Sequence, residues 1–183
     1  MRGMSVSDSA AWDPVTALTE SDRVSFKNRW PELCPLNVPG PFYTGQTDNC
    51  WTGRLHAPDY IMYGGEYFAE YVYRQPRDAA GVAAVVTAAG QDPCCGYGCD
   101  GDAHWTPEAV RAWWRDRDEV RLSVNATLAE LQAENREEYE EAALGALAYL
   151  AYLDDGLEED LRRYLFRLEE GRYPLDGDAL PHL

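Results

Sequence analysis

The sequence lacks any long apolar segment, since no run of apolar residues approaches the ~18 residues needed to cross a membrane. The first eight residues have no apolar stretch behind their one arginine, so we expect no secretory signal. Lysine is almost missing, because Lys27 is the only one, and a preference for arginine is typical of GC-rich bacterial genes. We therefore predict a bacterial, cytoplasmic protein that does not associate with membranes.

Positive charge is also scarce. Lysine and arginine together number 16 against 32 aspartates and glutamates, which gives a formal net charge of −16. A surface with that charge repels the phosphates of DNA and RNA, so the composition argues against direct nucleic-acid binding. The 183 residues are 45% hydrophobic and 12% aromatic, enough to fill the core of one domain spanning 1–183.

Catalytic signatures are missing as well. No G-x-S-x-G turn and no glycine-rich phosphate loop after a strand occurs, and there are only three histidines. The five cysteines are an odd number, which in a reducing cytoplasm indicates thiols or metal ligands rather than a disulfide framework. Whether the chain is an enzyme stays open, with the balance against it.

One cluster could carry chemistry. Cys94, Cys95, Cys99 and His104 lie within eleven residues, and thiolate and imidazole are the ligands that zinc prefers. Adjacent cysteines fit a single tetrahedral ion poorly, and small cysteines also pack as apolar residues in a tight turn. A metal- or thiol-dependent enzyme, or a metal-binding protein, centred on 94–104 is therefore the alternative hypothesis. Zinc is its possible cofactor, and no cofactor is favoured.

The first half of the chain predicts little regular structure. Asp13-Pro14 opens a short helix that we expect to reach Trp30. The proline- and glycine-rich segment 31–58 predicts an ordered loop with one short strand at 42–44. Two aromatic runs joined by Gly64-Gly65 then predict an antiparallel hairpin over 59–74.

The second half predicts helices, at 78–90, 106–114, 125–154 and 157–170. The break at 154–156 suggests that 125–170 is an acidic helical hairpin. Residues 1–12 and 172–183 are expected to be flexible tails. The predicted fold class is α+β: a small antiparallel hairpin or sheet with a proline/glycine-rich N-terminal loop region, packed against four to five helices.

Acidic residues are concentrated on the C-terminal helices, on both sides of the segment 142–153. In that segment almost every side of the helix is apolar, which predicts a buried helix. Like charges at this spacing cost stability, so the acids need a reason. One interpretation is a solvated face that maintains solubility, and the other is a surface for a cationic partner. Under the second, the partner-binding residues are Glu137, Glu138, Glu140, Glu141, Asp154, Asp155 and Glu158.

Aromatic residues offer a second possible surface, because tyrosine and tryptophan often anchor interfaces. The chain has more of them than a small core needs, among them Trp51, Tyr60, Tyr63, Tyr67, Tyr71, Tyr73, Trp113 and Trp114. Charge and composition together favour an acidic cytoplasmic binding protein that neutralises a basic partner. An immunity protein, or inhibitor of a nuclease-like toxin, would have these properties.

Overall fold

The computed structural model describes residues 12–134 and 136–183. Two 3₁₀ turns, Trp30–Glu32 and Gly101–Ala103, accompany the helices and strands. In chain order the helices and strands are α1 (Glu20–Arg23), β1 (Tyr43–Thr44), α2 (Thr52–His56), β2 (Ile61–Gly64), β3 (Ala69–Val72), α3 (Ala79–Gln91), β4 (Tyr97–Gly98), α4 (Pro107–Arg115), α5 (Arg117–Ala133), α6 (Glu137–Asp154) and α7 (Leu157–Glu170).

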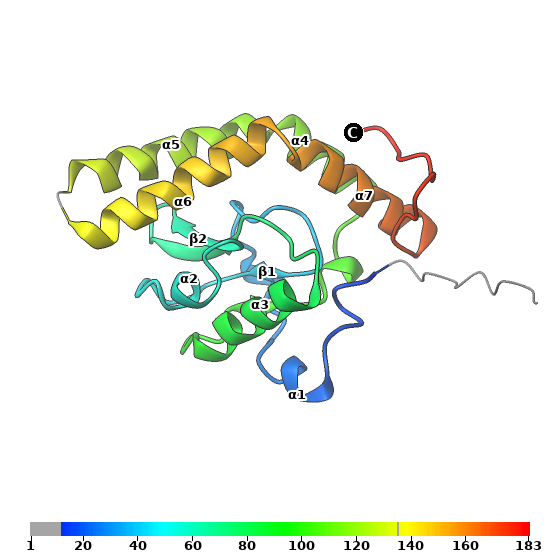
Figure 1. Ribbon diagram of the computed structural model, residues 1–183, viewed down its shortest axis with the longest axis horizontal. Helices are drawn as coiled ribbons and strands as arrows, with labels where there is room; N and C mark the ends of the chain where they lie inside the picture. The colour runs from blue at the N-terminus through cyan, green and yellow to red at the C-terminus, as the bar shows by residue number, and fades with distance from the viewer. Residues whose placement is uncertain (1–11, 135) are drawn as a thin grey trace, which may run out of the picture.

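The elements form layers around the strands. Helices α4 to α7 cover one side of the strands, with α5 and α6 packed along each other, while α3 and α1 lie on the other side (Figure 1). The predicted α+β class is confirmed, with two small antiparallel sheets, β1–β4 and β2–β3. No helix among the described residues is long and apolar enough to cross a membrane.

The predicted hairpin is confirmed and lies in the middle of the core. Strands β2 and β3 pair with Ile61 opposite Val72 and Gly64 opposite Ala69, so four residues, 65–68, form the turn instead of the expected Gly64-Gly65 pair. Both faces of the hairpin are buried. Tyr71 packs toward the α5–α6 layer, and Val72 packs among residues of α3.

A buried asparagine joins the two sheets. The Asn37 amide nitrogen donates to the carbonyls of Cys34 and Thr44, and its oxygen accepts from the backbone N–H groups of Thr44 and Val72. Three of these four bonds go to backbone groups of β1 and β3, and the fourth goes to the Cys34 carbonyl in the preceding loop. Asn37, only 1% exposed, therefore takes the place of a missing strand.

A buried carboxylate caps the short helix α2. Glu70 of β3 accepts hydrogen bonds from the Gly53 backbone N–H at 2.6 Å and from the Tyr97 hydroxyl at 2.7 Å. A Cβ at Gly53 would overlap both groups, so glycine permits this approach. Burial raises the pKa of Glu70 from its ordinary 4.5 to about 7, although both hydrogen bonds lower it.

A buried arginine couples α2 to the helical layer. The Arg54 guanidinium donates to the carbonyls of Pro58 and Ile61 and to both carboxylate oxygens of Glu141 on α6, the shorter contact being 2.6 Å. It lies against the bare backbone of Gly145, where a Cβ would overlap it. Because a charge this buried is costly without partners, the full set of bonds is what makes its position tolerable.

Several sequence predictions need correction in the N-terminal half. The expected helix from Asp13 to Trp30 does not form, and only the four residues of α1 are helical between turns. The loop 31–58 contains the predicted short strand, β1, but also helix α2, which no apolar repeat signals. Strand β4 was not predicted, since two residues carry too little periodicity to detect.

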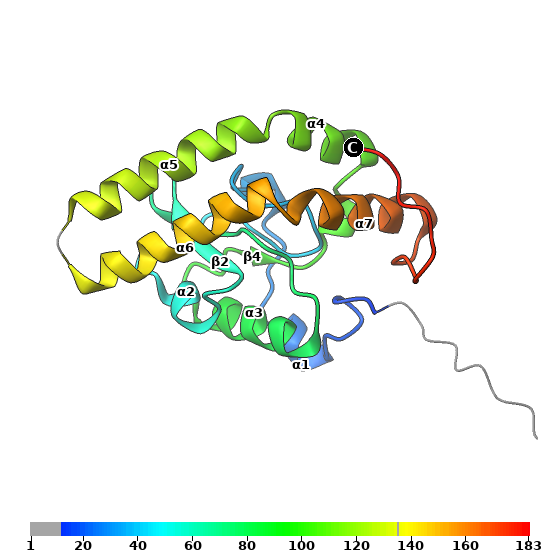
Figure 2. The ribbon, with the colours of Figure 1, turned by 45° about the horizontal axis from the view of Figure 1, so that its top comes forward.

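The acidic helices are also divided differently. The expected single helix over 125–154 is two helices, because α5 ends at Ala133 and α6 begins at Glu137. The chain folds back there, between α5 and α6, whereas α7 runs onward from the end of α6 (Figure 2). The helical hairpin predicted at 154–156 is therefore wrong in position. Asp154 ends α6 and Gly156, with a positive φ, precedes α7.

The C-terminal segment is not the flexible tail that we predicted. Arg162 donates to the carbonyls of Leu180 and Pro181, and Arg111 donates to the carbonyl of His182. Leu183 packs against the main core. Residues 172–183 are thus an ordered coil against α4 and α7. The tail predicted at the N-terminus lies outside the described residues, apart from Trp12.

We predict that stability depends on the charge of Glu141 and not on that of its neighbour. Glu141→Gln removes the counter-charge of a guanidinium that is 6% exposed and should lower the free energy of unfolding by about 1–3 kcal/mol. Glu140→Gln, at an exposed residue of the same turn that has no ion pair among the described residues, should change it by no more than ~0.5 kcal/mol. Equal effects in urea unfolding would contradict the coupling role of Arg54.

We also predict a pH dependence that belongs to Glu70. The pKa of Glu70 in the folded protein lies above its ordinary value. As the pH rises from 4.5 to about 7, Glu70 is therefore deprotonated in the unfolded chain while it still holds its proton in the folded protein. The native protein should therefore lose up to about 3 kcal/mol of stability over this window relative to Glu70→Gln. Glu66→Gln, at an exposed position in the hairpin turn, is the control and should keep the native dependence. If the urea unfolding midpoints of the native protein and of Glu70→Gln change by the same amount between about pH 5 and about pH 8, Glu70 is not the source of the pH dependence.

Candidate partner-binding clefts

Two clefts flank the β2–β3 turn, and Glu66 and Tyr67 at its tip line both. The first, of about 900 Å³, lies between the turn, the 32–36 segment and the start of α5. The second, of about 710 Å³, lies between the turn, Trp51 and the ends of α5 and α6 that meet at 134–139. Tyr67, 76% exposed, stands between them.

The first cleft has mainly apolar walls. Leu33, Pro35, Leu36 and Val120 line it together with the half-buried Trp113 and Cys34. Burial raises the pKa of the Cys34 thiol, so this sulfur stays protonated and behaves as part of the apolar wall. A partner side chain entering this cleft would gain by burying apolar surface.

The second cleft has an aromatic wall. The Trp51 ring stacks on Tyr63 with centroids 4.5 Å apart and lies 5.0 Å from Tyr139, while Tyr63 also contacts Phe68 at 6.2 Å. Tyr63 is buried beneath, and the other three rings line the cleft. Packing of this kind fixes the rings in advance, which lowers the entropy cost of binding against them.

The backbone near these rings is strained. Trp51 and Phe68 have φ values of +63° and +51°, a region that bulky side chains rarely adopt. The surrounding fold holds them there, because Glu70 fixes α2 just after Trp51 and the strand pair fixes the hairpin turn that contains Phe68. Such strain gathers at ligand-contacting sites more often than elsewhere, which makes these two rings candidates for a direct role.

The charge of the two clefts is of one sign. Among the described residues that line them no lysine, arginine or histidine occurs. Glu32 pairs with Arg29 and Asp116 with Arg115, whereas the other four acids form no ion pair with any residue that the structure describes. The lining carboxylates are Glu32, Glu66, Asp116, Glu119, Glu130 and Glu134.

The acids predicted from sequence fall into two groups at opposite ends of α6. Glu137, Glu138, Glu140 and Glu141 form its first turns, while Asp154, Asp155 and Glu158 surround its other end. The groups lie ~20 Å apart, since an α-helix rises about 1.5 Å per residue. Between them Leu144 and Leu147 are 65% and 45% exposed, so the expectation that this helix is buried all round is wrong.

Arginines neutralise part of this predicted set. Glu141 pairs with Arg54, Asp154 with Arg121 at 2.8 Å, and Glu138 with Arg136. The remaining members, Glu137, Glu140, Asp155 and Glu158, are exposed and form no ion pair in the described part of the chain. Those in the first turns of α6 and α7 also interact favourably with the helix dipole, which provides a structural reason for their positions.

Sequence reasoning missed most of the cleft. Glu130, Glu134 and Tyr139 lie within the acidic stretch that it identified, and Tyr139 joins that stretch to the aromatic wall. Glu32, Glu66, Asp116 and Glu119 come from segments that the fold alone brings together, and no spacing in the chain signals them. Of the aromatic residues considered, Tyr63, Tyr71 and Tyr73 are core.

The 94–104 loop does not assemble a site. No group of three or more His, Cys, Asp and Glu side chains in the described residues converges in a way that could hold a metal ion. Cys94 is exposed and Cys99 buried. The His104 ring stacks on Trp30 with centroids 4.7 Å apart, and its Nε2 lies 3.1 Å from the Asp100 carboxylate.

Two thiols of this loop, those of Cys94 and Cys99, are poorly suited to nucleophilic chemistry. Desolvation, and then the nearby Asp92 and Asp48 carboxylates, raise the pKa of Cys94. Burial is the largest cause of the raised pKa of Cys99. A nucleophilic cysteine needs the opposite shift, because the thiolate is the reactive form. The geometry therefore lends no support to the thiol-dependent alternative.

No protein-family model, curated protein or solved structure matches this chain.

Proposed function

We propose that this chain is an acidic, cytoplasmic bacterial protein that binds and neutralises a basic protein partner, as an immunity protein or inhibitor of a nuclease-like toxin does. The observation that carries the proposal is the pair of clefts around the β2–β3 turn, lined by six carboxylates and, among the described residues, by no basic side chain. Acids in clefts focus the electric field more strongly than acids scattered on a convex surface.

The aromatic wall supports a protein partner rather than a small cation. Trp51 stacks on Tyr63, while Tyr139 and Phe68 pack against this pair with tilted rings. Tyr67 projects from the turn. Interfaces typically bind through a few such anchors surrounded by polar residues. A basic protein whose active cleft is built for phosphates would present lysines and arginines to these carboxylates and lose access to its substrate.

The acids of α6 serve in this proposal as a steering group. Glu137 and Glu140 are exposed, form no ion pair within residues 12–134 and 136–183, and adjoin Tyr139 of the aromatic wall. Charges near an interface mainly accelerate association, whereas charges desolvated within it change dissociation as well. The acids at the far end of α6 contribute to the long-range field alone.

Capture at low salt should retain a partner whose isoelectric point is above about 9 and whose retention falls as salt rises from about 0.05 M to about 0.5 M. The immobilised full chain would be exposed to extract from its own source cells, and the retained protein identified by mass spectrometry. Retention of only neutral or acidic proteins, or binding indifferent to salt, would refute the proposal.

The cleft acids should matter more than equal charge elsewhere. We predict that Glu66→Lys, Glu130→Lys and Glu134→Lys together weaken binding of the captured partner by about tenfold or more, because the partner's cations lose their counter-charges. The control carries the same change in net charge at exposed positions outside the clefts: Asp59→Lys, Glu170→Lys and Asp176→Lys. Calorimetric titration showing equal losses in both variants would mean that only bulk charge acts.

Replacement of the acids in the first turns of α6 by lysine should mainly change the rate of association with the partner. We predict that Glu137→Lys, Glu138→Lys and Glu140→Lys slow association about tenfold at low salt and leave dissociation nearly unchanged. Glu141 is kept, since it neutralises the buried Arg54. Stopped-flow mixing with the captured partner measures both rates. An unaltered association rate would mean that these residues only maintain solubility and do not attract the partner.

A further inference from the structure

A third cleft differs from the two acidic ones in shape and in charge. It encloses about 350 Å³ where five parts of the chain meet: the N-terminal segment at Trp12, the 38–41 loop, the 75–77 segment, the α6–α7 region and the coil at 173–174. That volume is near the lower end of the range for small-molecule sites. The proposed partner-binding function does not use it.

The walls of this cleft are stiff and apolar. Aromatic rings from four segments line it, and five prolines fill the space between them, so little side-chain entropy remains to be lost on binding. Tyr152 and Tyr164 already donate their hydroxyls, to Asp160 and Asp102. The aromatic residues are Trp12, Tyr152, Tyr164 and Tyr173.

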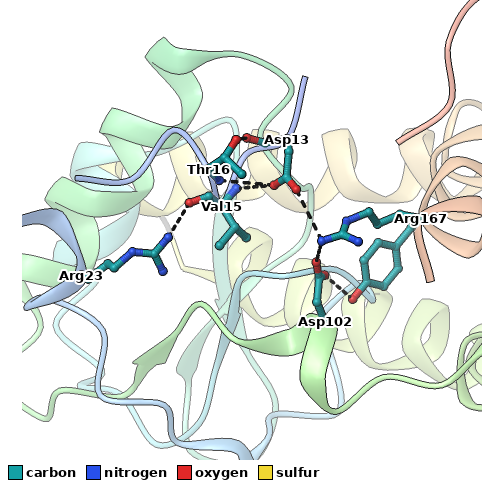
Figure 3. Close-up of polar contacts among 7 residues, drawn as sticks. Asp13, Val15, Thr16, Arg23, Asp102 and Arg167 are labelled. Atoms are coloured by element: carbon teal, nitrogen blue, oxygen red, sulfur yellow. Dashed lines mark hydrogen bonds and ion pairs between the residues drawn. The ribbon is translucent and has the colours of Figure 1, made fainter. Parts of the chain in front are cut away.

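An ionic clamp holds the N-terminal wall in place. Figure 3 shows Arg167 of α7 between the carboxylates of Asp13 and Asp102, at 3.5 and 3.1 Å. Asp13 also accepts the backbone N–H of Val15, and Arg23 donates to the carbonyl of Val15. These bonds position the segment that carries Trp12 and Pro14 over the cleft.

Two opposite charges in this cleft lack partners. Arg77 and Asp160 line it but pair with each other. Arg163 and Glu159, one turn apart on α7, also line it, and neither forms an ion pair or a side-chain hydrogen bond with any described residue. In a chain with twice as many acids as bases, a half-buried arginine without a carboxylate partner is notable.

We infer that this cleft binds a small zwitterion with an aromatic side chain, of the kind that a free aromatic amino acid represents. Arg163 receives the carboxylate, because guanidinium offers paired donors to a planar anion. Glu159 and the faces of the aromatic rings receive the ammonium group. The proline and tyrosine walls hold the ring.

Charge and size select this class. A net charge of −16 repels simple anions, and a simple cation would leave Arg163 without a counter-charge. A zwitterion offers a partner of opposite charge to both Arg163 and Glu159. An extended peptide advances about 3 Å per residue and needs a long groove, whereas this cleft is small and is bordered by the N-terminal segment at Trp12 and by the coil at 173–174.

Calorimetric titration of the full chain with L-phenylalanine and L-tryptophan tests the inference. We expect binding with a dissociation constant of about 1 mM or lower for at least one of them. 2-Phenylethylamine, which lacks the carboxylate, and 3-phenylpropionate, which lacks the ammonium group, should each bind about tenfold more weakly. Absence of heat with both amino acids up to about 10 mM, or equal binding of an amino acid and its amine, would overturn the inference.

Variants place the ligand in this cleft. Arg163→Gln should abolish the preference for L-phenylalanine over 2-phenylethylamine, and it should fold normally because Arg163 has no partner within the described chain to lose. Arg115→Gln, at an exposed arginine of α4, is the control and should retain the preference. A preference that survives Arg163→Gln would show that the carboxylate binds elsewhere and would also overturn the assignment.

Discussion

Buried backbone groups need hydrogen-bond partners, and this chain has few strand residues to provide them. Buried polar side chains take on that task, and three of them connect the layers of the fold. Asn37 joins β1 to β3, Glu70 caps α2, and Arg54 binds the carbonyls of Pro58 and of Ile61 in β2 while it reaches Glu141 on α6. Each is costly to bury alone and tolerable only with its complete set of bonds. The central hairpin, α2 and the helical layer therefore depend on one another.

The same supports shape the acidic clefts. Because α2 is capped by Glu70 and tied to α6 by Arg54, Trp51 can hold a strained backbone conformation and stack on Tyr63. The acids of the clefts and of the first turns of α6 are exposed, apart from the half-buried Glu32, and contribute little to this framework. Glu141 is the exception, since its carboxylate balances a buried charge. Folding and the proposed recognition of a basic partner thus rely on largely separate residues, so the surface charge can vary without loss of the fold.

Helix patterns could be predicted from the sequence because capping residues and apolar stripes act locally. Asp78 and Thr106 cap α3 and α4 where the helices predicted over 78–90 and 106–114 begin, and α7 spans the predicted 157–170. The prediction was wrong where local signals were weak or uniform. The helical pattern predicted over 125–154 does not show where the chain reverses direction between α5 and α6. The two-residue strands β1 and β4 are too short to show the alternation of side chains that identifies a strand.

For the candidate site, composition and local pattern were enough to predict the negative charge, the many aromatic residues and the acids within 125–170. Which of these residues lie next to one another depends on how the chain packs. Packing brings Glu32, Glu66 and Glu119 into one cleft and pairs Glu141 and Asp154 with arginines. Among the described residues, Cys99 does not join a group of side chains that could hold a metal ion. The reason is that charge and helix propensity are properties of short segments, whereas a cleft is made by side chains that are distant in sequence and adjacent only after packing.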